Sequence, residues 1–227
     1  MKQFTKIIFA ITLMLTLLII LVDYSGCSSI NGPKEKVPYK DSMTGEASVK
    51  LRTQMRELWS DHVMWTRNVI FCLVDELPGT DQAVKRLLQN QVDIGNSIKP
   101  FYGDEAGKKL TEILYAHINI SAEVVTAAKS GNAIKLDDAN KRWYANADEL
   151  SEFLCKANPM WNLQDMKMMM REHLKITTDE AVQRIKKDYD LDVAAFDKIH
   201  SEILMMADVL TDGIIKQFPE KFSNKNN

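Results

Sequence analysis

The sequence has few of the residues that form tight turns. Of its 227 residues, nine are glycine and six are proline, which disfavours all-β architectures because these need many turns. Lysine and arginine together number 29 and do not exceed the 31 aspartates and glutamates, so the formal net charge is −2. Proteins that bind nucleic acid usually carry a basic excess, and we therefore expect no nucleic-acid partner.

Cysteine is also scarce, and its spacing excludes the common thiol motifs. Cys27, Cys72 and Cys155 form no Cys-x-x-Cys pair, so neither a thiol redox motif nor a cysteine-rich zinc site is supported. The chain has no glycine-rich phosphate loop and no nucleophile elbow. These absences favour a protein without catalytic activity, and a metal-dependent enzyme is kept as an alternative.

The N-terminus has the pattern of an export signal. Two lysines, Lys2 and Lys6, precede an apolar run of 16 residues over 7–22, which is short for a spanning helix of about 20 residues and suits a signal peptide. Small residues then precede Cys27, as in the bacterial lipobox whose cysteine is acylated, although Tyr24 stands where that motif usually has an aliphatic residue. We expect lipidation at Cys27.

Two alternatives to lipidation are an uncleaved N-terminal transmembrane anchor and ordinary secretion. All three place the body of the protein on the extracytoplasmic side, because positive residues stay inside. The expected localisation is the extracytoplasmic face of the cell membrane, with the membrane itself as the partner that the sequence indicates.

The remainder of the chain predicts one all-α domain. We expect a signal segment over 1–26, a flexible linker over 27–49, a helical domain over 50–222 and a polar tail over 223–227. Apolar residues recur at three- and four-residue spacing throughout the domain, which predicts an antiparallel bundle of about six helices. The expected helices span about residues 50–76, 81–98, 104–129, 136–156, 162–176 and 178–218. The last begins at a capping box that starts at Thr177.

The four histidines provide the strongest functional signal. His62, His117, His173 and His200 each fall on the apolar face of a different expected helix. Helix rise places the first three, together with Asn146, at similar heights in an up-down bundle. His200 comes out higher.

One hypothesis is a metal or haem site inside the bundle. Imidazoles from facing helices are how bundle metal sites are built, and the candidate ligands are these four histidines with Asp93 and Asp197 as weaker ones. Zinc, iron, copper or haem would suit such a set. The alternative is a buried polar layer with no ligand, in which each histidine is hydrogen-bonded to a neighbouring helix.

A small-molecule pocket would use polar and aromatic residues of the same faces. The candidate lining residues are Trp65, Asn90, Trp143 and Asn146. The functional hypothesis is therefore a membrane-tethered, extracytoplasmic helical bundle that binds a metal ion, haem or a small ligand in an interior histidine and asparagine layer. The alternatives are a structural or interaction protein and a metal-dependent enzyme.

Several strings resemble a family of uncharacterised helical proteins from Gram-positive bacteria. They read LWSDHVMWTR from Leu58, NQVDIG from Asn90, RWYANAD from Arg142 and QFPEKF from Gln217. The resemblance covers about residues 55–222. It implies a helical fold and no established activity.

Overall fold

A computed structural model describes residues 43–223, and in that part of the chain every regular element is helical. The expected signal segment, Cys27, most of the linker and the last four residues of the tail lie outside the described residues. The helices are α3 (Glu46–Asp75), α4 (Thr80–Ser130), α5 (Ala133–Ala157), α6 (Leu163–Lys186), α7 (Tyr189–Gln217) and a short 3-10 helix, η1 (Pro219–Lys221). The prediction of an all-α bundle is confirmed.

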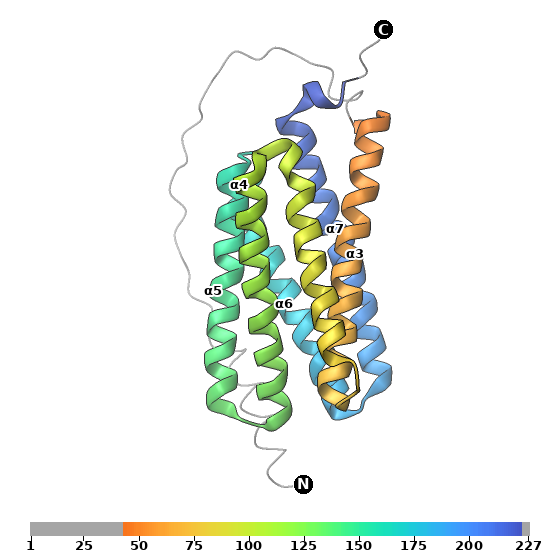
Figure 1. The fold of residues 1–227 in the computed structure, drawn as a ribbon, viewed down its shortest axis with the longest axis vertical. Coiled ribbons are helices and arrows are strands. Elements are labelled where there is room, and N and C mark those ends of the chain that lie inside the picture. The colour runs from red at the N-terminus through yellow and green to blue at the C-terminus, as the bar shows by residue number, and fades with distance from the viewer. Residues whose placement is uncertain (1–42, 224–227) are drawn as a thin grey trace. The chain divides into compact units, whose positions relative to one another are not determined.

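The helices follow an up-and-down path in which chain neighbours pack together. α3 packs against α4, α4 against α5, α5 against α6 and α6 against α7, and α7 packs back against α3. Figure 1 shows α3 beside the first half of α4 and α5 beside its second half. Side chains of all five helices therefore meet in one interior. None of the helices within residues 43–223 has the length and apolarity needed to span a membrane.

Helix α4 reverses direction in its middle. Gly103 has φ 84° and ψ 170°, a region of backbone space that is essentially restricted to glycine, and Pro100 lies one turn earlier. The chain folds back there, so the two halves of α4 run side by side (Figure 1). The described residues contain five α-helices, of which α4 joins the two helices expected over 81–98 and 104–129 across the kink at Gly103.

Two glycines allow the halves of α4 to approach closely. A Cβ atom added to Gly95 would lie 2.6 Å from the carbonyl oxygen of Gly107 and 2.0 Å from Oγ1 of Thr111. A Cβ atom on Gly107 would in turn lie 2.6 Å from the carbonyl oxygen of Gly95. Backbone therefore packs on backbone here, and any larger residue would push the halves apart.

We expect Gly95→Ala to destabilise the protein by about 1–3 kcal/mol, the usual cost of overpacking a close contact. In an ordinary helix interior the same change would stabilise by about 0.5–1 kcal/mol, because alanine has the higher helix propensity. The sign of the change in unfolding free energy, measured by urea denaturation, therefore tests the close approach. A stabilised variant would contradict it.

Two expected boundaries are wrong. Helix α3 begins at Glu46, so the last four residues of the expected linker are helical. The expected helix start at Thr177 is also wrong, because α6 continues to Lys186. Oγ1 of Thr177 donates to the carbonyl oxygen of His173 one turn earlier, a bond that a threonine makes inside a helix and not at its start. The chain turns instead at Lys187, which has φ 61°.

Candidate functional site: a buried histidine layer

Three of the four histidines meet in the interior of the bundle. His62 comes from α3, His117 from the second half of α4 and His173 from α6. The ring centroid of His173 lies 5.8 Å from that of His62 and 6.4 Å from that of His117. Each residue is at most 5% exposed. The expected convergence of these imidazoles is confirmed.

The hydrogen bonds of His117 use both nitrogens of its ring. Nδ1 lies 2.9 Å from Oδ1 of Asn146, whose amide nitrogen donates to the carbonyl oxygen of Ile113. That second bond fixes the orientation of the amide, so Nδ1 of His117 is the donor. The indole Nε1 of Trp143 donates to Nε2 of His117 at 3.2 Å, because an indole nitrogen can only donate. His117 is therefore a fully bonded, neutral imidazole.

His173 pairs with a carboxylate that the sequence analysis did not identify. Its Nδ1 donates to Oε2 of Glu202 on α7 at 3.0 Å, since a carboxylate accepts hydrogen bonds. Glu202 lies on the buried stripe of α7 between Ile199 and Ile203. The sequence does offer one signal for Glu202, because it is a charged residue within an apolar helix stripe. The other ring nitrogen of His173, Nε2, forms no hydrogen bond with the described residues.

His62 lies against the amide of Gln91 on the first half of α4. Nε2 of Gln91 is 3.3 Å from Nδ1 of His62 and also donates to the carbonyl oxygen of Leu87 and to Oδ1 of Asn90. An amide nitrogen offers only hydrogens, so Nδ1 of His62 accepts. A neutral His62 then carries its hydrogen on Nε2.

Burial keeps two of these rings neutral. Desolvation lowers the pKa of His62 well below 6.5, and electrostatic repulsion from His173 and then from His117 lowers it further. The pKa of His117 falls to about 4, mainly by desolvation and then by the charge of His173, against the raising effect of the Asn146 hydrogen bond. Both rings therefore act as hydrogen-bonding groups at neutral pH.

The layer does not assemble the expected metal ligands. Within residues 43–223, no group of three or more His, Cys, Asp or Glu side chains could hold a metal ion. The hydrogen bonds explain this, because Nε2 of His117 accepts from Trp143 and Nδ1 of His62 accepts from Gln91. Nε2 of His62 and Nε2 of His173 are the ring nitrogens of the layer that form no hydrogen bond with the described residues.

Two fully buried polar atoms beside His62 lack a hydrogen-bond partner in the described part of the chain. They are the donor Nε1 of Trp59 and the acceptor Oε1 of Gln91. The Trp59 ring centroid is 5.7 Å from that of His62, and both residues are at most 4% exposed. Leaving such a group unpaired costs about 1–3 kcal/mol. The surroundings of His62 thus offer donors and acceptors that no protein group uses.

The other candidate ligands lie apart from this layer. His200 is half-buried, bonds to Oγ of Ser60 at 3.0 Å and packs against Phe196. Asp197 is exposed. Asp93 accepts a hydrogen bond from Gln89 on its own helix. No hydrogen bond or ring contact in residues 43–223 joins these three to the buried histidines.

The four candidate pocket residues divide in the same way. Trp143 and Asn146 bond to His117, as described above. Asn90 is buried beside Gln91 and donates to the carbonyl oxygen of Leu58. Trp65 is half-buried, lies under the guanidinium of Arg86 at 5.2 Å and belongs to a separate apolar cluster. Three of the four thus border the histidine layer and Trp65 does not.

A second polar cluster lies between α3, α6 and α7. Its members are two arginines and three carboxylates, Arg67, Arg184, Asp75, Glu180 and Asp192, which we call the ion-pair cluster. Nη1 of Arg67 lies 2.5 Å from Glu180 and 2.8 Å from Asp192. Burial raises the pKa of Glu180 to about 7, against the lowering effect of Arg67, and the charge of Asp192 raises it further.

No protein-family model, no curated protein and no solved structure matches this chain. The fold and the site define the class of protein, an antiparallel all-α bundle with a histidine-containing polar layer through its core.

Proposed function

We propose that this protein is a membrane-tethered, extracytoplasmic binding protein that holds a small polar ligand in its interior histidine layer. The observation that carries the proposal is the pair of unpartnered buried atoms beside His62, Nε1 of Trp59 and Oε1 of Gln91. Buried polar groups in native proteins nearly always have partners. A ligand that both accepts and donates hydrogen bonds would supply them.

Two buried rings border these atoms. The ring centroids of His62 and His173 are 5.8 Å apart, and Nε2 of neither ring bonds to a described residue. The Glu202 carboxylate orients His173 from the far side of its ring, as a positioning residue does in preorganised sites. The surroundings would suit a small polar molecule better than an ion that needs three imidazole lone pairs.

A second candidate is a structural layer that fixes the register of the helices without a ligand. The complete hydrogen bonding of His117 favours it, because nothing is left for a ligand to bind there. Buried polar groups can specify a single helix register in this way.

The metals and small molecules that copurify with the protein distinguish a ligand-binding site from a structural layer. The full chain is purified with a tag that contains no histidine, then analysed for metals and, after denaturation, for small molecules by mass spectrometry. The expected result is one stoichiometric species in the wild type and in His200→Gln, and its loss in His173→Gln. His200→Gln is the matched control because it removes an imidazole outside the layer.

Binding of added probes gives a second measurement. Formamide and imidazole are each added during thermal unfolding, and at least one is expected to raise the Tm of the wild type and not that of His173→Gln. Zn²⁺, Cu⁺ and haem are added in parallel and are expected to leave the Tm unchanged. If the protein carries no stoichiometric species and no probe shifts its Tm, the ligand proposal is wrong and the structural layer is favoured.

The tether is tested separately at Cys27, which lies outside the described residues. In the native bacterial membrane, Cys27→Ala is expected to abolish incorporation of radiolabelled fatty acid, because the thiol is the site of acylation. Cys72→Ala serves as the control and should label normally. Continued labelling of Cys27→Ala would contradict lipidation at this residue.

A further inference from the structure

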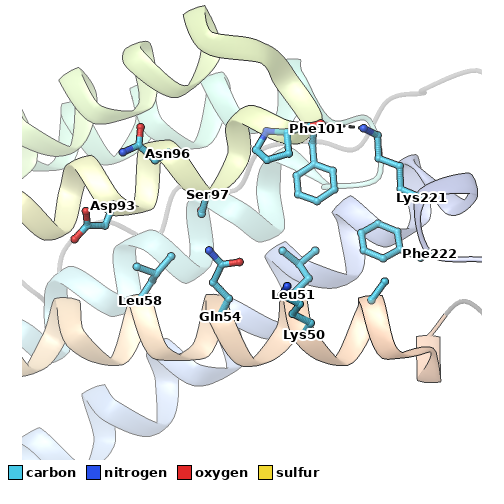
Figure 2. Close-up of a pocket in the computed structure, with 12 residues that line it drawn as sticks. Lys50, Leu51, Gln54, Leu58, Asp93, Asn96, Ser97, Phe101, Lys221 and Phe222 are labelled. Carbon is cyan, nitrogen blue, oxygen red and sulfur yellow. Dashed lines mark hydrogen bonds between the residues drawn. The ribbon is translucent and has the colours of Figure 1, made fainter.

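A groove runs along the surface between α3 and the first half of α4. It has a volume of about 530 Å³, within the range of small-ligand sites. Leu51 and Leu58 of α3 lie on one side and Phe101 of α4 on the other, and Phe222 lies at one end (Figure 2). The rings of Phe101 and Phe222 are stacked with centroids 5.8 Å apart. The groove is therefore largely apolar towards the end with Phe222, and Gln54 and Ser97 lie along its middle (Figure 2).

The two ends of the groove carry opposite charges. Lys50 and Lys221 lie at the end with Phe222, whereas Asp93 and Asn96 lie at the other end (Figure 2). Nζ of Lys221 donates to the carbonyl oxygen of Pro100 at 2.9 Å, which holds its charge at this end. Lys50 is exposed and forms no ion pair with a described residue.

Helix geometry gives the distance between these charges. Lys50 and Leu58 are eight residues apart on α3, as are Asp93 and Phe101 on α4, and each span corresponds to about 12 Å at a rise of 1.5 Å per residue. An extended peptide advances about 3.3–3.6 Å per residue. Three or four residues would therefore reach from one end of the groove to the other.

We propose that this groove binds a short peptide of three or four residues with free termini and apolar side chains. Its amino group lies beside Asp93, its carboxylate lies beside Lys50 and Lys221, and its side chains pack on Leu51 and Phe101. The site is separate from the histidine layer and does not depend on it. It adds an extracellular peptide to the chemistry that the protein recognises.

The charge pattern favours this occupant over a fatty acid. A carboxylate at the lysine end would satisfy Lys50 and Lys221, but an acyl chain long enough to fill the groove would then cover Asp93 and Asn96. Covering a carboxylate and an amide with hydrocarbon removes their hydration without replacing it, which disfavours an acyl chain at this end. An amino group at that end would instead pair with Asp93.

The test measures binding of the tetrapeptide Ala-Leu-Phe-Ala to the full chain by calorimetry. Two blocked forms, the N-acetyl and the C-amide peptide, remove one terminal charge each. We expect each blocked form to bind about 2- to 5-fold more weakly, the effect of one exposed ion pair. Palmitate is measured in parallel.

Variants assign each terminus to its partner. The Asp93→Asn variant is expected to bind the free peptide and the N-acetyl peptide equally. It should still bind the free peptide more tightly than the C-amide peptide. In the Lys50→Gln variant, the difference in affinity between the free peptide and the C-amide peptide should be smaller than in the wild type. The difference between the free peptide and the N-acetyl peptide should be unchanged. Lys109→Gln is the control, because Lys109 pairs with Glu149 on α5 and does not line the groove.

The proposal is overturned if the free peptide does not bind, if blocking either terminus leaves its affinity unchanged, or if palmitate binds more tightly than the peptide. It is also overturned if Lys109→Gln changes the ratio of affinities for the free and blocked peptides as much as Asp93→Asn does. Circular dichroism of each variant establishes that the bundle is folded. His173→Gln should bind the peptide like the wild type, so failure of the interior ligand site would leave this result unaffected.

Discussion

Arg67→Met is expected to lower the free energy of unfolding by about 3–5 kcal/mol, the usual cost of removing one partner from a buried ion pair. For a domain of this size such a loss corresponds to a fall in Tm of roughly 10 °C. Thermal and urea unfolding, followed by circular dichroism, measure both quantities.

The size of this effect follows from what Arg67 contacts. Its Nη1 donates to Glu180 and Asp192, whose side chains are 2% and 1% exposed. Its guanidinium also lies over the rings of Phe71 and Phe196, at 4.5 and 4.6 Å from their centroids. Methionine fills much of the same volume but supplies no charge, so the two carboxylates would lose their nearest buried counter-charge.

Arg56→Met is the matched control. Arg56 is paired with Asp208, but the Arg56 side chain is 48% exposed, and exposed pairs contribute about 0–1 kcal/mol. The double variant Arg67→Met/Glu180→Gln should recover part of the loss, because it removes one of the stranded charges. If Arg67→Met costs no more than Arg56→Met, the ion-pair cluster does not stabilise the fold in the way described.

The meeting of His62, His117 and His173 was predictable because each lies on the apolar stripe of its own helix. Stripe position fixes which way a side chain points, and helix rise fixes its approximate height. Asn146 followed from the same reasoning. The all-α class rests on this periodicity as well, and it needs no knowledge of how the helices cross.

The partners of the histidines were less predictable. Which residue of a neighbouring helix faces a given imidazole depends on crossing angles and on relative rotation, and a one-residue change rotates a helix by about 100°. Glu202 and Trp143 therefore acquire their roles only in three dimensions. Those roles decide the chemistry, since the Trp143 indole takes the nitrogen of His117 that a metal would need.

The predicted helix start at Thr177 was wrong because the same sequence pattern fits both a helix start and a helix interior. The sequence from Thr177 to Glu180 has the pattern of a capping box, but threonine can equally donate to a carbonyl within a continuing helix, and Thr177 does so. Glu180 is then free to face Arg67 on α3. Arg67 therefore pairs with carboxylates of α6 and α7.

Acid is expected to destabilise the protein through its buried imidazoles. The pKa of His117 is about 4 in the folded chain and 6.5 at its ordinary value, and the pKa of His62 is also lowered. Both rings bind protons more readily when unfolded. Their contribution to stability is therefore complete above pH 6.5 and is lost as the pH falls towards 4. For His117 alone the loss is roughly 3 kcal/mol.

Glu180 has the opposite effect over the same range. Its pKa is about 7 when folded and 4.5 at its ordinary value, so the folded chain binds the proton more tightly. The stability that it contributes is complete below pH 4.5 and is lost as the pH rises through 7. The wild type should consequently lose less stability between pH 7 and pH 4.5 than the two imidazoles would cost without Glu180.

Single substitutions separate the two effects. We expect His117→Gln to gain roughly 3 kcal/mol relative to the wild type between pH 7 and pH 4, and Glu180→Gln to lose stability more steeply on acidification than the wild type does. Urea unfolding at half-unit pH intervals measures the slopes, and NMR titration of the His117 ring gives its pKa directly. Glu105→Gln is the control, because its side chain is 91% exposed and its slope should match that of the wild type. The two substitutions are expected to change the slope of unfolding free energy against pH in opposite directions. Parallel plots for His117→Gln and Glu180→Gln would therefore mean that neither group has the shifted pKa that its burial requires.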